Sequence, residues 1–185
     1  MLGLFIAMTS LTSGLIASPV VADVDGNRHR PLLEAAGKPI AIIFIAHDCP
    51  VCNTYAPEIG RIETKYGGLV KIDIVYSEPS LTAAQAKAHA KAYGIGRAVL
   101  LLDPGSNFAA YCHARVTPQA VVYDGQGRSV YSGRIDDRYY ALGQQRPAPT
   151  THDLARALDC VLAGKVPPSA AGPPVGCFIL TPHST

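Results

Sequence analysis

Two cysteines separated by two residues, Cys49 and Cys52, are the side chains of this sequence best suited to chemistry. They follow the apolar run 39–46 and open a segment with a helical pattern. Backbone N–H groups and the helix dipole stabilise a thiolate at a helix N-terminus. Pro50 suits the first helical turn, where its missing N–H would have no partner. We therefore predict that Cys49, presented at the mouth of the helix, is a nucleophile and that Cys52 is the resolving thiol.

The elements that must position these cysteines alternate along the chain. Strands are predicted at 39–46, 69–76, 99–102, 119–123 and 129–134, and helices at 50–66, 82–93, 106–113 and 150–162. The last helix is expected to open with a capping box between Thr150 and Asp153. Strands separated by helices, then a hairpin and a final helix, predict an α/β fold, a three-layer sandwich with a central mixed sheet flanked by helices.

Further motifs extend the pattern beyond the two cysteines. Pro57 stands five residues after Cys52, and Val116-Thr117-Pro118 precedes a predicted strand. Together these features resemble the thioredoxin superfamily, in particular its exported redoxin branch of TlpA-like and AhpC-TSA-like proteins. The resemblance covers about residues 23–163. It implies a thioredoxin-like fold, a helix kinked at Pro57, a cis-proline at Pro118 that faces the cysteines, and a Thr117 backbone that pairs with a bound partner chain.

Two positions depart from the pattern of thioredoxin. Ile43 stands where thioredoxin has a buried Asp, and Asp48 replaces the Trp that precedes the first cysteine. Without the buried carboxylate, either His47, Asp48 or water must accept and supply protons, or the acidity of the thiol is set in a different way. A carboxylate at position 48 would oppose thiolate formation, whereas a protonated His47 would favour it. The sequence leaves the net pKa shift, and hence the direction of electron flow, open.

Three further cysteines bring the total to five. Cys112 precedes the Pro118 loop and either approaches the active site or simply ends a helix. Cys160 is expected to be a half-buried, inert thiol on the last helix. Cys177 follows a proline-rich stretch; the tail is expected to be disordered, with delivery of Cys177 to another thiol of this chain or of a neighbour as the alternative.

The ends and the charge of the chain bear on its location. Residues 1–22 contain no charged residue and read as a secretory signal peptide, followed by a redoxin domain at 23–165 and a Pro-rich tail at 166–185. The protein is thus expected to be exported, periplasmic or secreted, where disulfides persist. With 16 basic and 14 acidic residues, the chain has no field that would recruit nucleic acid. Membrane contact is expected only through an uncleaved N-terminal segment.

The leading interpretation is an exported thiol–disulfide oxidoreductase. It acts on a protein thiol or disulfide through a mixed disulfide, with an unidentified redox partner, and needs no cofactor or metal. One alternative is a peroxiredoxin-like peroxidase, although the chain lacks the Pro-x-x-x-Thr/Ser-x-x-Cys loop of that family. Another is a copper carrier of the same fold, with Cys49, Cys52 and a histidine such as His113 as soft-metal ligands.

Overall fold

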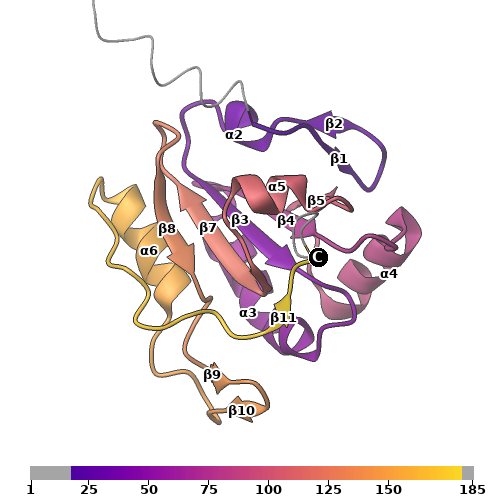
Figure 1. Cartoon of the computed structure of the whole chain (residues 1–185). Coiled ribbons are helices and arrows are strands. Elements are labelled where there is room, and N and C mark those ends of the chain that lie inside the picture. The colour runs from indigo at the N-terminus through magenta and orange to yellow at the C-terminus, as the bar shows by residue number, and fades with distance from the viewer. Residues whose placement is uncertain (1–17, 181–185) are drawn as a thin grey trace, which may run out of the picture.

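A mixed seven-stranded sheet forms the centre of the computed structural model, which describes residues 18–180 (Figure 1). The strand order is β2-β1-β5-β4-β3-β7-β8. The strands are β1 (Val21–Asp23), β2 (Arg28–His29), β3 (Ile40–Ile45), β4 (Lys71–Tyr76), β5 (Val99–Leu102), β7 (Gln119–Tyr123) and β8 (Ser129–Gly133). β3, β4 and β5 run parallel, whereas β7 is antiparallel to β3 and β1 is antiparallel to β5. Every residue of β3 is apolar and buried, as expected for a central strand covered on both faces.

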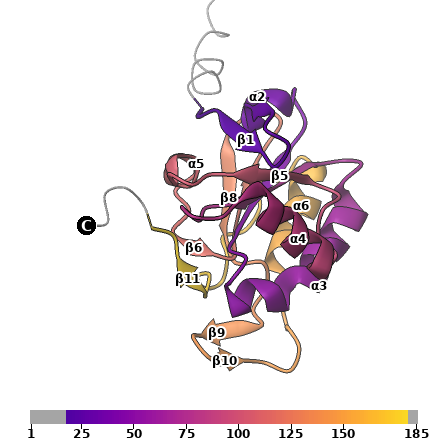
Figure 2. The ribbon, with the colours of Figure 1, turned by 90° about the vertical axis from the view of Figure 1, so that its right-hand side faces the viewer.

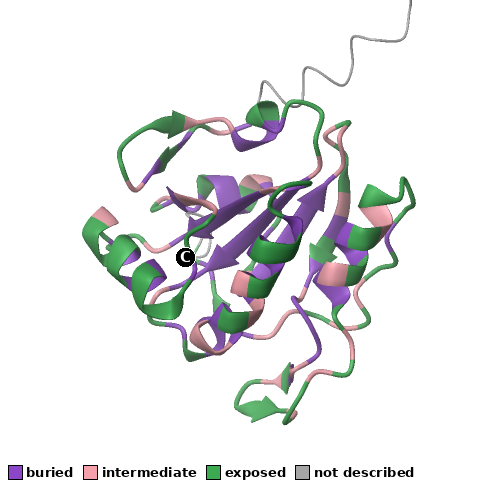
Figure 3. Ribbon diagram, turned by 180° about the vertical axis from the view of Figure 1, so that it is seen from behind, coloured by how far each residue is buried: buried purple, intermediate pink, exposed green. Residues whose placement is uncertain are grey.

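Helices cover both faces of the sheet. They are α2 (Pro31–Glu34), α3 (Pro50–Tyr66), α4 (Ala83–Tyr93), α5 (Asn107–Tyr111) and α6 (Asp153–Leu162). Successive residues of a strand point to opposite faces, so β3 contributes to two cores. Ile43 packs in the core under α3, α4 and α6, and Phe44 in the core under α2 and α5. Figure 3 shows the buried strands between exposed helix faces. The predicted α/β sandwich with a mixed sheet is confirmed.

Several local details differ from the sequence expectations. The predicted capping box at Thr150 is wrong: α6 begins at Asp153 with His152 as N-cap, and the Thr150 hydroxyl bonds to the buried carboxylate of Asp137 instead. The β1–β2 hairpin and α2 were not predicted. Neither was a second hairpin, β9 (Tyr139–Ala141) with β10 (Gln144–Gln145), which projects from the lower end of the molecule in Figure 1.

The predicted signal segment lies mostly outside the described residues, so its role stays a prediction. Its last two residues, Val21 and Ala22, belong to strand β1, where Val21 is buried. The boundary predicted after Ala22 therefore falls inside a strand of the sheet. No helix within residues 18–180 is long and apolar enough to cross a membrane.

The C-terminal segment is ordered against the domain, so the expectation of a disordered tail is wrong for residues 166–180. Its strand β11 (Cys177–Phe178) pairs antiparallel with β6 (Val116–Thr117), and the two lie side by side in Figure 2. On its way to β6, the segment passes close to Gly133 of β8. A Cβ atom at Gly133 would lie 2.7 Å from the Cβ of Ala170, so glycine permits this close approach. Ile179 is 7% exposed and packs into the core under α2 and α5. This apolar anchor explains why a proline-rich tail holds one position.

Candidate active site

The predicted cysteine pair lies where β3 ends and α3 begins. Cys49 is the N-cap residue of α3, and Pro50 occupies the first helical turn, as predicted. Cys52 lies one turn further in, and its Sγ accepts a hydrogen bond of 3.4 Å from the backbone N–H of Ala46. Pro57 lies inside α3, also as predicted. The helix start thus holds two sulfur atoms at its positive end.

The Pro118 loop meets this helix start. The Thr117–Pro118 peptide bond is cis, as the family resemblance implied. The thiol of Cys49 lies 3.5 Å from the carbonyl oxygen of Thr117. Two segments far apart in sequence therefore form one site.

A third cysteine lies in the same place. The Sγ of Cys177 is 2.8 Å from the Sγ of Cys49, and Cys177 is the cross-strand neighbour of Thr117 in the β6–β11 pair. Cys49 is 0% exposed. Cys49 thus lies at the mouth of the helix, as predicted, but is closed off from solvent, because Cys177 and the strand that carries it lie against it.

The sulfur atoms differ strongly in acidity. The pKa of Cys49 is lowered to about 5, mainly by hydrogen bonding from the Cys52 side chain and further by Cys177. Burial, followed by the interaction with Cys49, raises the pKa of Cys52 well above its ordinary value. Partial desolvation of its sulfur and the interaction with Cys49 raise the pKa of Cys177 to about 12, although the residue as a whole is exposed. One thiolate, on Cys49, is thus stabilised by two protonated neighbours.

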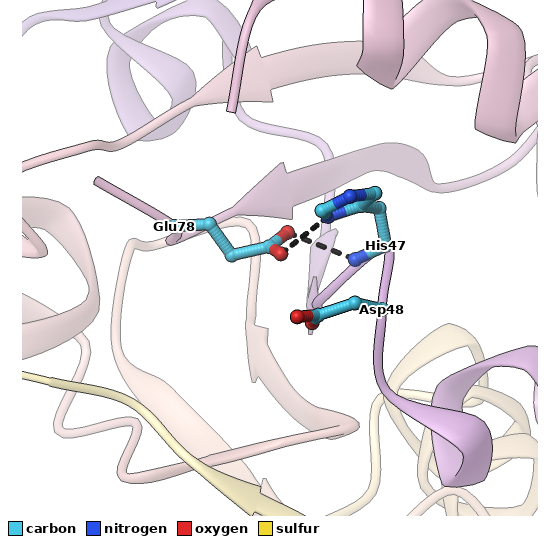
Figure 4. A group of neighbouring side chains, drawn as sticks. All are labelled: His47, Asp48 and Glu78. Atoms are coloured by element: carbon cyan, nitrogen blue, oxygen red, sulfur yellow. Dashed lines mark hydrogen bonds and ion pairs between the residues drawn. The ribbon is translucent and has the colours of Figure 1, made fainter. Parts of the chain in front are cut away.

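His47 is held by a residue that the sequence analysis missed. The backbone N–H of His47 donates to Glu78 over 2.8 Å, and its Nδ1 lies 2.5 Å from the second oxygen of the same carboxylate (Figure 4). Glu78 follows β4 as His47 follows β3. The parallel pairing of Ile45 with Tyr76 brings both strand ends to one edge, a signal available from the predicted strands.

His47, Asp48 and Glu78 form a group of possible metal ligands. One ligand atom from each residue lies within 4.8 Å of those of the other two. This group offers one imidazole and two carboxylates. Such a ligand set suits hard or borderline cations and not Cu(I), which prefers sulfur. No other group of three such ligands lies so close together among the described residues, so His113 of the copper hypothesis does not join the cysteines.

A partly buried chain of hydrogen bonds next to His47 was also missed. The Tyr76 hydroxyl oxygen lies 2.8 Å from Nδ1 of His89, and Nε2 of His89 lies 2.9 Å from the side-chain oxygen of Asn53. Asn53 in turn donates to the carbonyl oxygen of His47. Burial lowers the pKa of His89, so its neutral form links these groups. No sequence pattern indicates this chain of hydrogen bonds, because residues 82–93 are predicted to form a surface helix.

The structure does not bring Cys112 to the site. Cys112 packs in the core under α2 and α5, on the face of the sheet opposite Cys49 and Cys52. Burial raises its pKa to about 12. Cys160 is partly buried on α6, as expected.

Comparisons with known proteins bear on the fold of this chain. No protein-family model matches the sequence, and no curated protein is similar to it in sequence. A hypothetical protein from Sinorhizobium meliloti is similar in structure, with a TM-score of 0.77 and 28% identity over 91% of this chain and 93% of the other. An uncharacterized conserved protein from Geobacillus kaustophilus matches with a TM-score of 0.75 and 27% identity, over 91% of this chain and 92% of the other.

A secreted Mycobacterium tuberculosis disulfide oxidoreductase homologous to E. coli DsbE is a more distant neighbour. It matches with a TM-score of 0.59 and 16% identity over 82% of this chain and 98% of the other. At that identity the likeness concerns the fold alone. The sheet order, the helices on both faces and these neighbours agree: the chain has a thioredoxin-like fold and carries a Cys-x-x-Cys pair at the start of α3.

Proposed function

We propose that this protein is an extracytoplasmic thiol–disulfide oxidoreductase in which Cys49 is the nucleophile and Cys52 the resolving thiol. The observation that carries the proposal is the opposite acidity of two sulfur atoms one helical turn apart. A thiolate is the reactive form of cysteine, and a pKa of about 5 keeps Cys49 ionised at neutral pH. Cys52 stays protonated until it is needed.

The reaction follows from this difference. The Cys49 thiolate attacks one sulfur of a substrate disulfide, forms a mixed disulfide and releases the other substrate sulfur as a thiolate that takes up a proton. Cys49 then carries no charge, which removes one cause of the raised Cys52 pKa. Cys52 loses its proton and attacks the Cys49 sulfur. The substrate leaves as a dithiol and the Cys49–Cys52 disulfide remains. The reverse sequence oxidises a dithiol.

A location outside the cytoplasm is part of the proposal. It is supported by the uncharged segment 1–22, which is typical of a secretory signal peptide. Fractionation of cells that produce the full chain, with mass spectrometry of the exported form, tests it. A chain found only in the cytoplasm would contradict it. The mass of the exported chain would also identify the cleavage site. The site matters for the fold, because cleavage after Ala22 would remove two of the three residues of β1.

A trapping experiment tests the assignment of the two cysteines. Both variants carry Cys177→Ser, because the Cys177 sulfur lies close enough to Cys49 to release a trapped substrate. With a disulfide-bonded peptide, Cys52→Ser in this background is expected to accumulate a mixed disulfide at Cys49. Cys49→Ser in the same background should accumulate none. Equal trapping by both variants, or by neither, would overturn the proposal.

A further inference from the structure

The C-terminal strand occupies the position that a partner chain would take. The resemblance to the thioredoxin superfamily implies that a bound partner chain pairs its backbone with Thr117, and here β11 of the same chain does so. Cys177 is the residue opposite Thr117, the Thr117 hydroxyl lies 3.5 Å from the Cys177 carbonyl oxygen, and the N–H of Ile179 donates to the carbonyl of Arg115 over 2.9 Å. The strand is therefore bound along the Pro118 loop by its backbone.

The residue before Cys177 permits this close approach. A Cβ atom at Gly176 would overlap the carbonyl oxygen of Thr117 and lie 3.1 Å from the ring of Pro118. Any side chain here would push the strand away from the loop. Gly176 is itself buried, whereas the flanking Phe178 is 78% exposed. Glycine thus allows Cys177, the next residue, to lie against Cys49.

We propose that Cys177 is an internal redox partner of Cys49 and that the C-terminal strand is a built-in substrate, forming a Cys49–Cys177 disulfide in exchange with the Cys49–Cys52 disulfide. The inference rests on the proposed function and names one partner of its nucleophile. The two sulfur atoms, 2.8 Å apart, need to approach by less than about 1 Å to reach the disulfide length of about 2.05 Å.

The exchange is balanced within the chain. The Cys177 thiolate attacks Cys49 of the Cys49–Cys52 disulfide, the new sulfur–sulfur bond forms, and the old one breaks to leave a Cys52 thiolate. The proton lost by Cys177 is matched by the one that Cys52 takes up, and no external oxidant is needed. Cys177 can release a substrate from a mixed disulfide at Cys49 in the same way, and the substrate sulfur then takes the proton.

This arrangement also controls access to Cys49. A partner strand cannot pair with Thr117 while β11 is there, and Cys49 is 0% exposed in this state. A protein substrate must therefore displace the C-terminal segment. Small disulfides need access to the Cys49 sulfur but no backbone position along the loop, so they probe the sulfur chemistry without strand pairing.

The experiment uses the full chain carrying Cys52→Ser, treated in the reduced state with glutathione disulfide. Cys49 first forms a mixed disulfide with glutathione, and Cys177 then displaces the glutathione thiolate. We expect an intramolecular Cys49–Cys177 disulfide, identified by peptide mapping after thiol blocking. The glutathione adduct should persist at least about tenfold longer in Cys52→Ser/Cys177→Ser, because the neighbouring thiol acts at a high effective concentration. Cys52→Ser/Cys160→Ser is the matched control and should behave like Cys52→Ser.

A second variant separates the position of the C-terminal strand from the presence of the Cys177 thiol. Gly176→Val in the Cys52→Ser background keeps Cys49 and Cys177 and displaces the strand, so the glutathione adduct should again persist about tenfold longer. Equal adduct lifetimes with and without Cys177, or a Cys49–Cys177 link between two chains, would overturn the inference. If wild-type chain still turned over a disulfide peptide in that case, the proposed function would stand. Failure of Cys49 to react with glutathione disulfide at all would overturn both.

Discussion

Cys49 and Cys112 are both buried cysteines of one small domain, and they lie on opposite faces of the same sheet. The pKa of Cys49 is lowered to about 5, whereas that of Cys112 is raised to about 12. Burial by itself acts to raise the pKa of both thiols, and at Cys49 other contributions outweigh it. The difference lies in what surrounds each sulfur: Cys49 caps a helix and faces two sulfur donors, whereas Cys112 is surrounded by apolar core and the hydroxyl of Tyr123.

The comparison indicates that burial alone makes a thiol inert. Desolvation disfavours the charged form, and only hydrogen bonds to the thiolate or a favourable dipole reverse that effect. At Cys49 those contributions come from Cys52, Cys177 and the start of α3. A cysteine that is covered from solvent can therefore still be ionised when the groups that cover it donate hydrogen bonds to its thiolate.

The largest difference between the two thiols should appear in turnover. Cys49→Ala is expected to lower the rate of peptide disulfide reduction by at least about a thousandfold, to the background of a free thiol, because the nucleophile is gone. Cys112→Ala should retain turnover, since no atom of Cys112 reaches the site. The measurement is reduction of a disulfide-bonded peptide with a thiol reductant. A large loss in Cys112→Ala with the fold intact would break the comparison.

A thiolate titration measures the same difference directly. Ultraviolet absorbance of the reduced protein is expected to rise with a midpoint near pH 5, since the Cys49 thiolate forms as pH rises through its lowered pKa. At neutral pH Cys49 should be almost fully ionised, against a few per cent for an ordinary thiol. The step should vanish in Cys49→Ala and remain in Cys112→Ala. A single midpoint near the ordinary cysteine pKa would contradict the assignment.

Cys112 should matter for stability instead. Removing a buried sulfur leaves a small void in the core under α2 and α5, where Cys112 is 2% exposed. Cys112→Ala is therefore expected to lower the free energy of unfolding by about 1–2 kcal/mol, measured by urea denaturation of the reduced protein. Cys160→Ala, at a partly exposed position on α6, is the matched control and should cost less. Equal costs would show that the core does not depend on the Cys112 side chain.

Sequence reasoning reached the part of the site that local patterns determine. The helix 50–66 and its Cys49 N-cap follow from an apolar run and a Cys-x-x-Cys spacing. The cis-Pro118 loop is what the resemblance to the thioredoxin superfamily implied. It missed Glu78 and His89, because contacts between elements depend on strand register and on helix packing. It misjudged the tail because proline-rich composition predicts disorder, whereas Ile179 and Gly176 supply an anchor and a close approach that only the folded domain defines.

The smallest effect concerns the charges around Cys177. After burial and Cys49, the carboxylates of Asp48 and Glu78 are the next causes of its raised pKa. Glu78→Gln removes one negative charge and keeps an oxygen that accepts the N–H of His47, so the Cys177 thiolate should become easier to form. In the Cys52→Ser background at pH 8, the Cys49–Cys177 disulfide is then expected to form about two- to threefold faster. Asp159→Asn, an exposed charge on α6, is the control and should leave the rate unchanged. A slower rate in Glu78→Gln would mean that Glu78 acts by positioning His47 and the loop, and not through its charge.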